Sequence, residues 1–413
     1  MATNTINTIK DGPGVFARGI AQTLKDNMHL CSFVDQADKS DFDGKNSFKS
    51  GDTIYTAIPP RYVPQSDNLD VTSAISDTVE EKKALTLNKT ESIAMEFDSL
   101  ELATEVDVAV ALKRYGIPAA ESIAQHVESR CFGIVQDATY NLSGTAGSNT
   151  FTISDVLEAK TLLDVNLAPV QDRMLFMTSA AGAAAVDARS GLFQSSSKVA
   201  EQYEHGYIGR ADGFDWVNTE LINSHTNGND VTGITKNAIS VEGDSTFPVS
   251  GLTATTGTVT KGTVFTVANV FRVHPITKTV TSELQQFVVT ADATADGSGN
   301  ATLSISPSIY AGSGGLQNVD SLPANTAAVT IGTGAVSTGY LQNIAMHNKA
   351  FKMCTAPLYA PRGTDMVATE TVDGITVNLV RDFDINTRKV ITRLDILYAF
   401  DEVRPEWSSR LTA

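Results

Sequence analysis

Two stretches of the chain repeat apolar residues at the spacing of one helical face. Near the start, Val15, Phe16, Ile20 and Leu24 follow this spacing, which predicts a helix over residues 15–29. A longer helical pattern covers residues 118–142 and opens on Pro118, since proline is well tolerated in the first turn of a helix. Its apolar positions recur at intervals of three and four and are Ile123, Val127, Cys131, Ile134, Val135 and Ala138.

Residues 51–100 have an extended pattern instead. The segment DTIYTAIPPRYVPQSDNLDV is broken by prolines, and ALTLNKTESIAMEF then alternates apolar and polar residues. The alternating apolar residues are Leu85, Leu87, Ile93, Met95 and Phe97. We expect two strands joined by the polar stretch from Ser76 to Lys83. Because a long two-stranded hairpin is marginal alone, the pattern predicts that it lies on another chain.

A short β-α alternation follows the long helix. Asp155 with Glu158 resembles a helix start, RMLFMTS reads as a buried strand, and Ser179 is placed to cap the helix AAGAAAVDAR. The alternation predicts a small sheet flanked by helices. Three further strand patterns, HNKAFKMCTAPL, GITVNLVRDFDI and KVITRLDILYAF, lie near the end of the chain and read as strands of the same first domain.

Residues 226–345 differ from the rest in charge. The chain has 31 basic and 47 acidic residues, and only 11 of them fall in this window. Strand patterns such as TVFTVANVFRV, ELQQFVVTA, ATLSISPSI and AAVTI are separated by turn clusters such as DGSGN. Short strands at this spacing predict a small antiparallel barrel or sandwich, inserted as a domain.

Length, charge and cysteine content disfavour several classes of protein. The 413 residues imply two or three domains, and a formal net charge of −16 disfavours a phosphate-neutralising surface for nucleic acid. The three cysteines, Cys31, Cys131 and Cys354, are sparse and odd in number, which argues against a disulfide framework and favours a reducing compartment. Neither a signal-peptide core nor a run of 18 apolar residues is present, so we expect no membrane segment.

Motifs for chemistry are weak or absent. Gly12, Gly14 and Ala17 fit a loose GxGxxG/A pattern, but no strand precedes them as a dinucleotide site requires. The acids near a glycine turn, Asp212, Asp215 and Glu220, could hold a cation, although a solvated loop is the better interpretation. We therefore expect no catalytic residue, no metal and no cofactor, and predict a structural protein rather than an enzyme.

Three segments carry a family resemblance. LTATTGTVTKGTVFTVANV, FVVTADATADGSGNATLSISPSI and the closing TRLDILYAFDEVRPEWSSRL resemble the major capsid (coat) protein of tailed bacteriophages. The specific resemblance is to the coat protein of short-tailed lambdoid phages, which carries an inserted β-barrel domain. It implies an α+β tailed-phage capsid fold. The implied domains are an arm (1–50), an extended hairpin loop (51–100), a spine-helix or peripheral domain (101–165), an axial domain (166–225), the barrel (226–345) and return strands (346–413).

The resemblance also implies contact residues. Glu242 and Asp244 lie in ISVEGDSTFPVSG, which matches a family loop that makes charged contacts between capsomers, although the segment is shorter here. The hairpin lysines Lys82, Lys83 and Lys89 occupy the region where some tailed phages form covalent cross-links. This group is not known for such bonds, so we expect none.

The implied function is a shell of hexamers and pentamers of this chain, an icosahedral head around double-stranded DNA that is not bound sequence-specifically. The implied partners are a scaffolding protein and a portal, with no membrane. The protein would be located in the virion after assembly in the host bacterial cytoplasm. The alternative is a tail or surface adhesin with a β-sandwich binding domain. An adhesin would bind through exposed barrel aromatics, whereas Phe265, Phe271 and Phe287 sit in strand patterns that favour core packing.

Overall fold

The computed structural model describes residues 13–36, 53–58, 81–98, 108–147, 152–189, 209–238, 241–312, 315–359 and 363–412. The chain divides into two compact units. Unit 1 comprises Met1–Thr56, Ala84–Cys131 and Lys352–Asp401, and unit 2 comprises Ala57–Lys83, Phe132–Phe351 and Glu402–Ala413.

Unit 1 is built on a five-stranded sheet. Its order is β18 (Phe351–Ala356), β21 (Lys389–Glu402), β20 (Ile375–Asp384) and β19 (Met366–Val372), and β3 (Lys89–Asp98) pairs antiparallel with β21. Along β3 the side chains alternate between half-buried and exposed, with Ile93 and Met95 on the half-buried face. The period-two pattern therefore predicted an extended strand here, but the predicted hairpin pairing was wrong for β3, which pairs with β21 instead.

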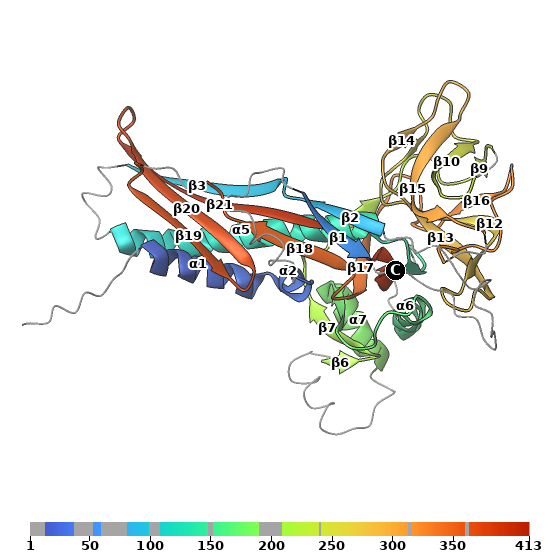
Figure 1. Cartoon of the computed structure of the whole chain (residues 1–413), viewed down its shortest axis with the longest axis horizontal. Helices are drawn as coiled ribbons and strands as arrows, with labels where there is room; N and C mark the ends of the chain where they lie inside the picture. Colours follow the sequence, from blue (N-terminus) through green and yellow to red (C-terminus); the bar gives the residue numbers. More distant parts are fainter. Residues whose placement is uncertain are drawn as a thin grey trace, which may run out of the picture. The chain divides into compact units, whose positions relative to one another are not determined.

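Two helices of the arm belong to the same unit. α1 (Pro13–Asn27) buries Ala17, Ile20, Ala21 and Leu24, which recur at helical spacing, and packs on β19 and β20 (Figure 1). Lys25, near its end, forms an ion pair with Asp373. The short α2 (His29–Phe33) follows after Met28, so the predicted helix over residues 15–29 is two helices with a break at its end.

The long helix α5 (Val108–Ala138) begins ten residues before the predicted start. Pro118 lies inside it rather than in its first turn. A proline in a helix interior removes one backbone hydrogen bond and costs about 3 kcal/mol. Here the helix continues because Ala120, Ile123, Ala124 and Val127 are completely or almost completely buried along one face and offset that loss.

The hairpin segment is described only near its base. β1 (Thr53–Ile58) pairs with β2 (Glu81–Thr86), and residues 59–80 lie outside the described part of the chain. Because β2 starts at Glu81, Lys82 and Lys83 belong to a strand and not to the predicted polar connection. Leu85 and Leu87 are buried with Cys354, Leu397 and neighbouring apolar residues.

Unit 2 contains a seven-stranded sheet. Its order is β4 (Leu142–Gly144), β22 (Ser408–Thr412), β17 (Gly339–His347), β5 (Arg173–Met177), β7 (Phe214–Asn218) and β6 (Arg210–Ala211), with β8 (Ser224–Thr226) paired to β17. The single-turn helix η2 (Pro405–Trp407) leads into β22.

The helix starts of this sheet differ from the predicted ones. α6 (Ile153–Val165) is capped by Thr152, whose side chain accepts from the Asp155 N–H while the Asp155 carboxylate accepts from the Thr152 N–H. Asp155 is therefore the third residue of the helix and the partner of the cap in a capping box, and Thr152 is the cap itself. For α7 (Ser179–Arg189), the Thr178 hydroxyl accepts from the Ala181 N–H, so the cap lies one residue before Ser179.

Residues 226–345 hold strands and no helix among the residues described. A six-stranded sheet runs in the order β16 (Val329–Ile331), β12 (Val264–Val273), β13 (Val280–Val289), β15 (Ala301–Ile309), β10 (Asp244–Ser250) and β9 (Thr235–Lys236). The short strands β11 (Thr258–Val259) and β14 (Ala293–Thr294) come from the same segment and form a separate antiparallel pair. We call this six-stranded sheet the barrel.

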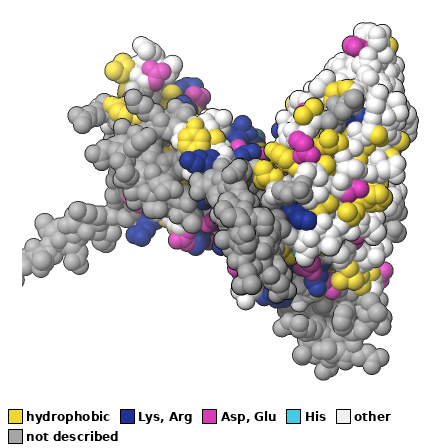
Figure 2. Space-filling model, turned by 45° about the vertical axis from the view of Figure 1, so that its right-hand side comes forward, with side chains coloured by type: hydrophobic (Ala, Val, Ile, Leu, Met, Phe, Trp, Pro, Cys, Tyr) yellow, Lys and Arg dark blue, Asp and Glu magenta, His cyan; other side chains and the backbone are white. Residues whose placement is uncertain are grey.

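The barrel is nearly closed by its two end segments. The Lys236 N–H donates to the Ala327 carbonyl at 2.9 Å, and the Val329 N–H donates to the Ile234 carbonyl at 3.0 Å. Closure removes the open sheet edges that would otherwise invite pairing with other chains. On the face shown in Figure 2, the barrel side carries mostly uncharged side chains, in keeping with the low charge of its sequence.

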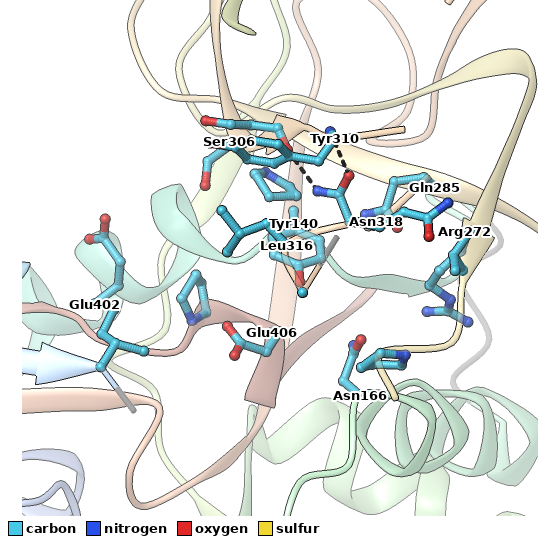
Figure 3. Close-up of a pocket in the computed structure, with 18 of the residues that line it drawn as sticks. Tyr140, Asn166, Arg272, Gln285, Ser306, Tyr310, Leu316, Asn318, Glu402 and Glu406 are labelled. Carbon is cyan, nitrogen blue, oxygen red and sulfur yellow. Dashed lines mark hydrogen bonds between the residues drawn. The ribbon is translucent and has the colours of Figure 1, made fainter. Parts of the chain in front are cut away.

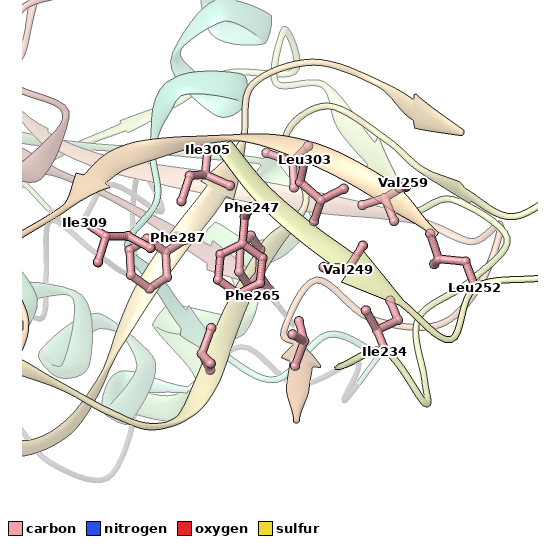
Figure 4. Close-up of a cluster of buried hydrophobic side chains, with 14 of the residues drawn as sticks. Ile234, Phe247, Val249, Leu252, Val259, Phe265, Phe287, Leu303, Ile305 and Ile309 are labelled. Atoms are coloured by element: carbon pink, nitrogen blue, oxygen red, sulfur yellow. The ribbon is translucent and has the colours of Figure 1, made fainter. Parts of the chain in front are cut away.

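Aromatic side chains form the centre of the barrel core (Figure 4). The ring centroids of Phe247 and Phe265 are 5.4 Å apart, and those of Phe265 and Phe287 are 5.7 Å apart. Phe271 is only half-buried. Core packing was therefore the right interpretation for Phe265 and Phe287. The fold as a whole is α+β, as predicted, and most of its elements are strands.

The predicted edge Ala345 lies within β17. It pairs there with Leu175 of β5 and Ser409 of β22, whereas the first residues of β17 pair with β8. The pairing of Thr226 with Gly339 is where the two ends of the inserted segment meet.

The barrel core gives a direct test. We expect Phe287→Ala to destabilise the barrel by about 3–5 kcal/mol, because a fully buried ring is replaced by a cavity. Phe271→Ala is the matched control and should cost clearly less, since that ring is half-exposed. Urea unfolding of the full chain measures both. Equal losses for the two variants would contradict the assignment of Phe287 to the core.

Candidate inter-subunit surfaces

Glu242 lies on the turn that leads into β10, and Asp244 is the first residue of that strand. The Glu242 carboxylate accepts from the Ala311 N–H at 3.2 Å. The Asp244 carboxylate accepts from the Thr246 hydroxyl at 2.7 Å and from the Thr246 N–H at 3.0 Å. The Thr246 hydroxyl in particular lowers the pKa of Asp244, so this acid is charged at neutral pH. The turn also presents Val241, which is 67% exposed.

The three lysines occupy β2 and the start of β3. Lys82 is exposed, while Lys83 forms an ion pair with Glu402. The Lys89 ammonium donates to the Phe400 carbonyl at 3.1 Å. Two of the three candidate lysines therefore hold contacts inside the chain.

Sequence reasoning missed a polar network where the inserted segment joins the sheet of unit 2. His225 of β8 and Asn227 are hydrogen-bonded, with His225 Nε2 and Asn227 Oδ1 3.1 Å apart. The Thr333 hydroxyl donates to the same Asn227 oxygen at 2.6 Å, and Thr263 lies 3.4 Å from the His225 ring nitrogen. All four side chains are buried. No sequence motif marks them, because they come from three separate segments.

The same junction has a second polar connection. The Gln286 side chain of β13 accepts from the Leu142 N–H at 2.8 Å and donates to the Leu142 carbonyl at 2.9 Å. It therefore satisfies the backbone of β4 as a neighbouring strand would. Around it, Tyr140, Leu142, Val264 and Val288 form a small apolar cluster.

Two cationic side chains, Lys261 and Arg410, also make polar contacts near this junction. The Lys261 ammonium lies 3.0 Å from the Asp137 carboxylate at the end of α5. Arg410 of β22 is completely buried and donates to the Gln342 side-chain oxygen at 2.9 Å. Burial lowers the pKa of Arg410 to about 9, which shows how strongly this site penalises charge.

Unit 2 also contains a cavity of about 470 Å³ (Figure 3). Barrel residues including Arg272, Gln285, Tyr310 and Asn318 line one part, and Tyr140, Asn166, Glu402 and Glu406 line the other. In Figure 3 the Arg272 guanidinium points toward Asn166, and the two glutamates lie on the opposite side. The lining combines polar and apolar side chains with charges of both signs, and none of the named groups is arranged as a nucleophile with its base.

The candidate cation site was not supported. Among the described residues no group of three or more His, Cys, Asp or Glu side chains lies close enough together to hold a metal ion. Within the same part of the chain, no helix is both long and apolar enough to cross a membrane.

The buried histidine generates a pH prediction. Burial lowers the pKa of His225 to about 4, and the Arg410 charge adds to this shift. The unfolded chain therefore binds a proton more readily, and stability should fall as pH drops from about 6.5 to about 4, by at most about 3 kcal/mol. His225→Gln keeps a donor for Asn227 and should flatten this part of the profile. Urea unfolding at pH 7 and pH 5 measures the difference, and an equally steep fall in the variant would contradict it.

Comparison with known proteins agrees with the family resemblance noted in the sequence. The family model "P22 coat protein - gene protein 5" matches residues 1–409. No curated protein matches the sequence. A solved chain of Mycobacterium phage Che8 is 12% identical, with a TM-score of 0.45 and 93% of this chain and 90% of that one covered. The capsid of Cyanophage P-SCSP1u is 11% identical, with a TM-score of 0.43 and coverage of 89% and 85%.

One further solved structure matches only a quarter of the chain. The CUS-3 coat protein I-domain is 26% identical, with a TM-score of 0.18, and the match covers 25% of this chain and 99% of that one. The predicted fold class, α+β with an inserted barrel, is confirmed by the described elements. Because the family model extends over nearly the whole sequence, the chain belongs to the P22 coat protein family and is a major capsid protein, a structural subunit of a phage shell.

Proposed function

We propose that copies of this chain assemble as hexamers and pentamers into an icosahedral head that encloses double-stranded DNA. The observation that carries the proposal is the family match over residues 1–409. Many weak contacts, each repeated around a closed shell, give a stable particle although each contact alone is weak.

The hairpin base supports contact with neighbouring copies. β1 pairs only with β2 among the described strands, and Tyr55 on it is 64% exposed. A two-stranded element with an exposed aromatic side chain gains stability when it lies on another surface. We propose that this surface is an adjacent subunit.

The charge of the chain suits a wall around packaged DNA. A net charge of −16 opposes binding to phosphates, so the DNA is held by enclosure and not by contacts with its sequence. Strong binding to the wall would hinder both packing and ejection.

The other partners that we propose are those implied by the family resemblance. They are a scaffolding protein and a portal, with assembly in the host bacterial cytoplasm and no enzymatic role. The adhesin alternative needed exposed aromatics on the barrel. Phe265 and Phe287 are buried there, and nothing else favours this alternative.

We also propose that Glu242 and Asp244 take part in contacts between capsomers. Both acids are anchored by backbone N–H groups of their own chain, which fixes where their charges point. A fixed charge loses less conformational freedom on contact with a partner than a mobile one does.

The assembly proposal is tested by electron microscopy of the expressed chain, alone and with its scaffolding protein. We expect closed shells or curved sheets with hexameric and pentameric units. Elongated trimers, or a permanent monomer under both conditions, would contradict the proposal.

The contact proposal needs variants that remove charge and keep the hydrogen bonds. Glu242→Gln and Asp244→Asn together retain acceptors for Ala311 and Thr246. Because an exposed ion pair contributes about 0.2–1 kcal/mol and is repeated at every copy, we expect shell yield to fall severalfold with little change in subunit unfolding.

Asp292→Asn is the matched control for this pair. Asp292 is also exposed and also accepts a backbone N–H, from Lys261 at 2.7 Å. Light scattering during assembly compares the variants. An equal loss of yield with Asp292→Asn would show a general effect of charge and contradict a specific role for the β10 turn.

A further inference from the structure

Two cysteines far apart in sequence meet inside unit 1. Cys31 lies on α2 and Cys131 lies on α5, and their sulfur atoms are 3.7 Å apart. Both residues are 0% exposed and carry free thiols. Sparse cysteines first argued against a disulfide framework, but the fold brings two of the three together.

The surrounding contacts hold the pair in place. The Leu30 N–H, next to Cys31 in the chain, donates to the Glu128 carboxylate at 2.7 Å. Glu128 lies three residues before Cys131 on α5, so the hydrogen bond and the sulfur contact are on neighbouring turns of one helix face. On the other side, the Gln36 side chain donates to the Cys31 carbonyl at 2.8 Å. The short helix α2 is therefore docked on α5 with its thiol directed at Cys131.

We propose that Cys31 and Cys131 are a disulfide site, which oxidises after the particle leaves the reducing host cytoplasm and then fastens α2 to α5. The timing rests on the proposed function as a phage shell, whereas the reactivity of the pair rests on the fold alone. A disulfide has an S–S distance of about 2.05 Å, so closing the gap takes a shift of less than about 2 Å shared by two side chains.

The oxidant is a small-molecule disulfide of the glutathione class. One cysteine thiolate attacks this disulfide, forms a mixed disulfide and releases one small-molecule thiolate. The second cysteine thiolate then attacks the protein sulfur of the mixed disulfide and releases the other. The two cysteines lose two electrons and two protons in total, and the reagent takes up both as two thiols.

The same surroundings keep the thiols reduced until the host lyses. The hydrogen bond with Cys131 and burial both raise the pKa of the Cys31 thiol, so little thiolate exists in the closed state. Reaction therefore needs local opening of α2, a helix of five residues that buries Leu30 and Cys31. In a reducing compartment any bond that forms is removed again.

The bond would close a loop that contains the whole hairpin segment. Residues 31–131 include β1, β2 and β3, and long loops lose the most unfolded-state entropy when they are cross-linked. We expect slower release of α2 in particles that have been exposed to an oxidising medium.

The test counts thiols in the full chain after native incubation with oxidised glutathione. Titration after denaturation should show a fall from three free thiols to one, and the mass should fall by about 2 Da, for two hydrogens. Proteolysis without reduction should give one peptide pair that joins Cys31 to Cys131. The same measurement is made on free subunits and on assembled particles, so a failure to assemble does not affect the thiol count.

The third cysteine provides the matched control. Cys354→Ser should still lose two thiols on oxidation. Cys31→Ser and Cys131→Ser should form no disulfide within the chain. Three thiols remaining after incubation of the wild-type chain would overturn the proposal. A stable mixed disulfide on either residue, or a disulfide between two chains, would overturn it as well.

Discussion

The antiparallel pairing of β8 with the first residues of β17 is the constraint on which the rest of unit 2 depends. Because Thr226 lies opposite Gly339, the inserted segment leaves the sheet and returns to it at one point. Bringing chain ends together costs free energy that grows only slowly with the length between them. The sheet of unit 2 can therefore carry a complete barrel at this position with its own strand order unchanged.

A barrel attached at one point needs further contacts to keep a defined orientation, and the junction supplies polar ones. Gln286 satisfies both backbone groups of Leu142, and the side chains of His225, Asn227 and Thr333 share hydrogen bonds. Buried polar groups are costly when they lose a partner. The network therefore favours the one arrangement in which its members are paired, and protonation of His225 would disrupt it.

The sequence predicted those features that depend on neighbouring residues. Leu303 and Ile305 alternate with serines, so β15 was evident, and the low charge of residues 226–345 marked the inserted module. Features formed by distant segments were not predictable. The closure of the barrel at Ile234 and Val329, the contact of Cys31 with Cys131, and the buried Arg410 all depend on which segments meet in space. The start of α5 was mispredicted at Pro118, because burial along the helix outweighs the local preference of proline for a first turn.

The distribution of buried charge strengthens the argument about DNA. Among the described residues, five buried charged side chains are cations and two are acids: Arg173, Lys236, Arg272, Lys352 and Arg410, against Glu128 and Asp395. Burial of a charge is costly, and it keeps that cation out of direct contact with molecules outside the protein. Since the chain already carries an excess of acids, this placement leaves its described surface more acidic than its composition alone indicates. A shell built from such surfaces would repel a polyanion at close range, which is consistent with the proposed enclosure of DNA without adhesion to the wall.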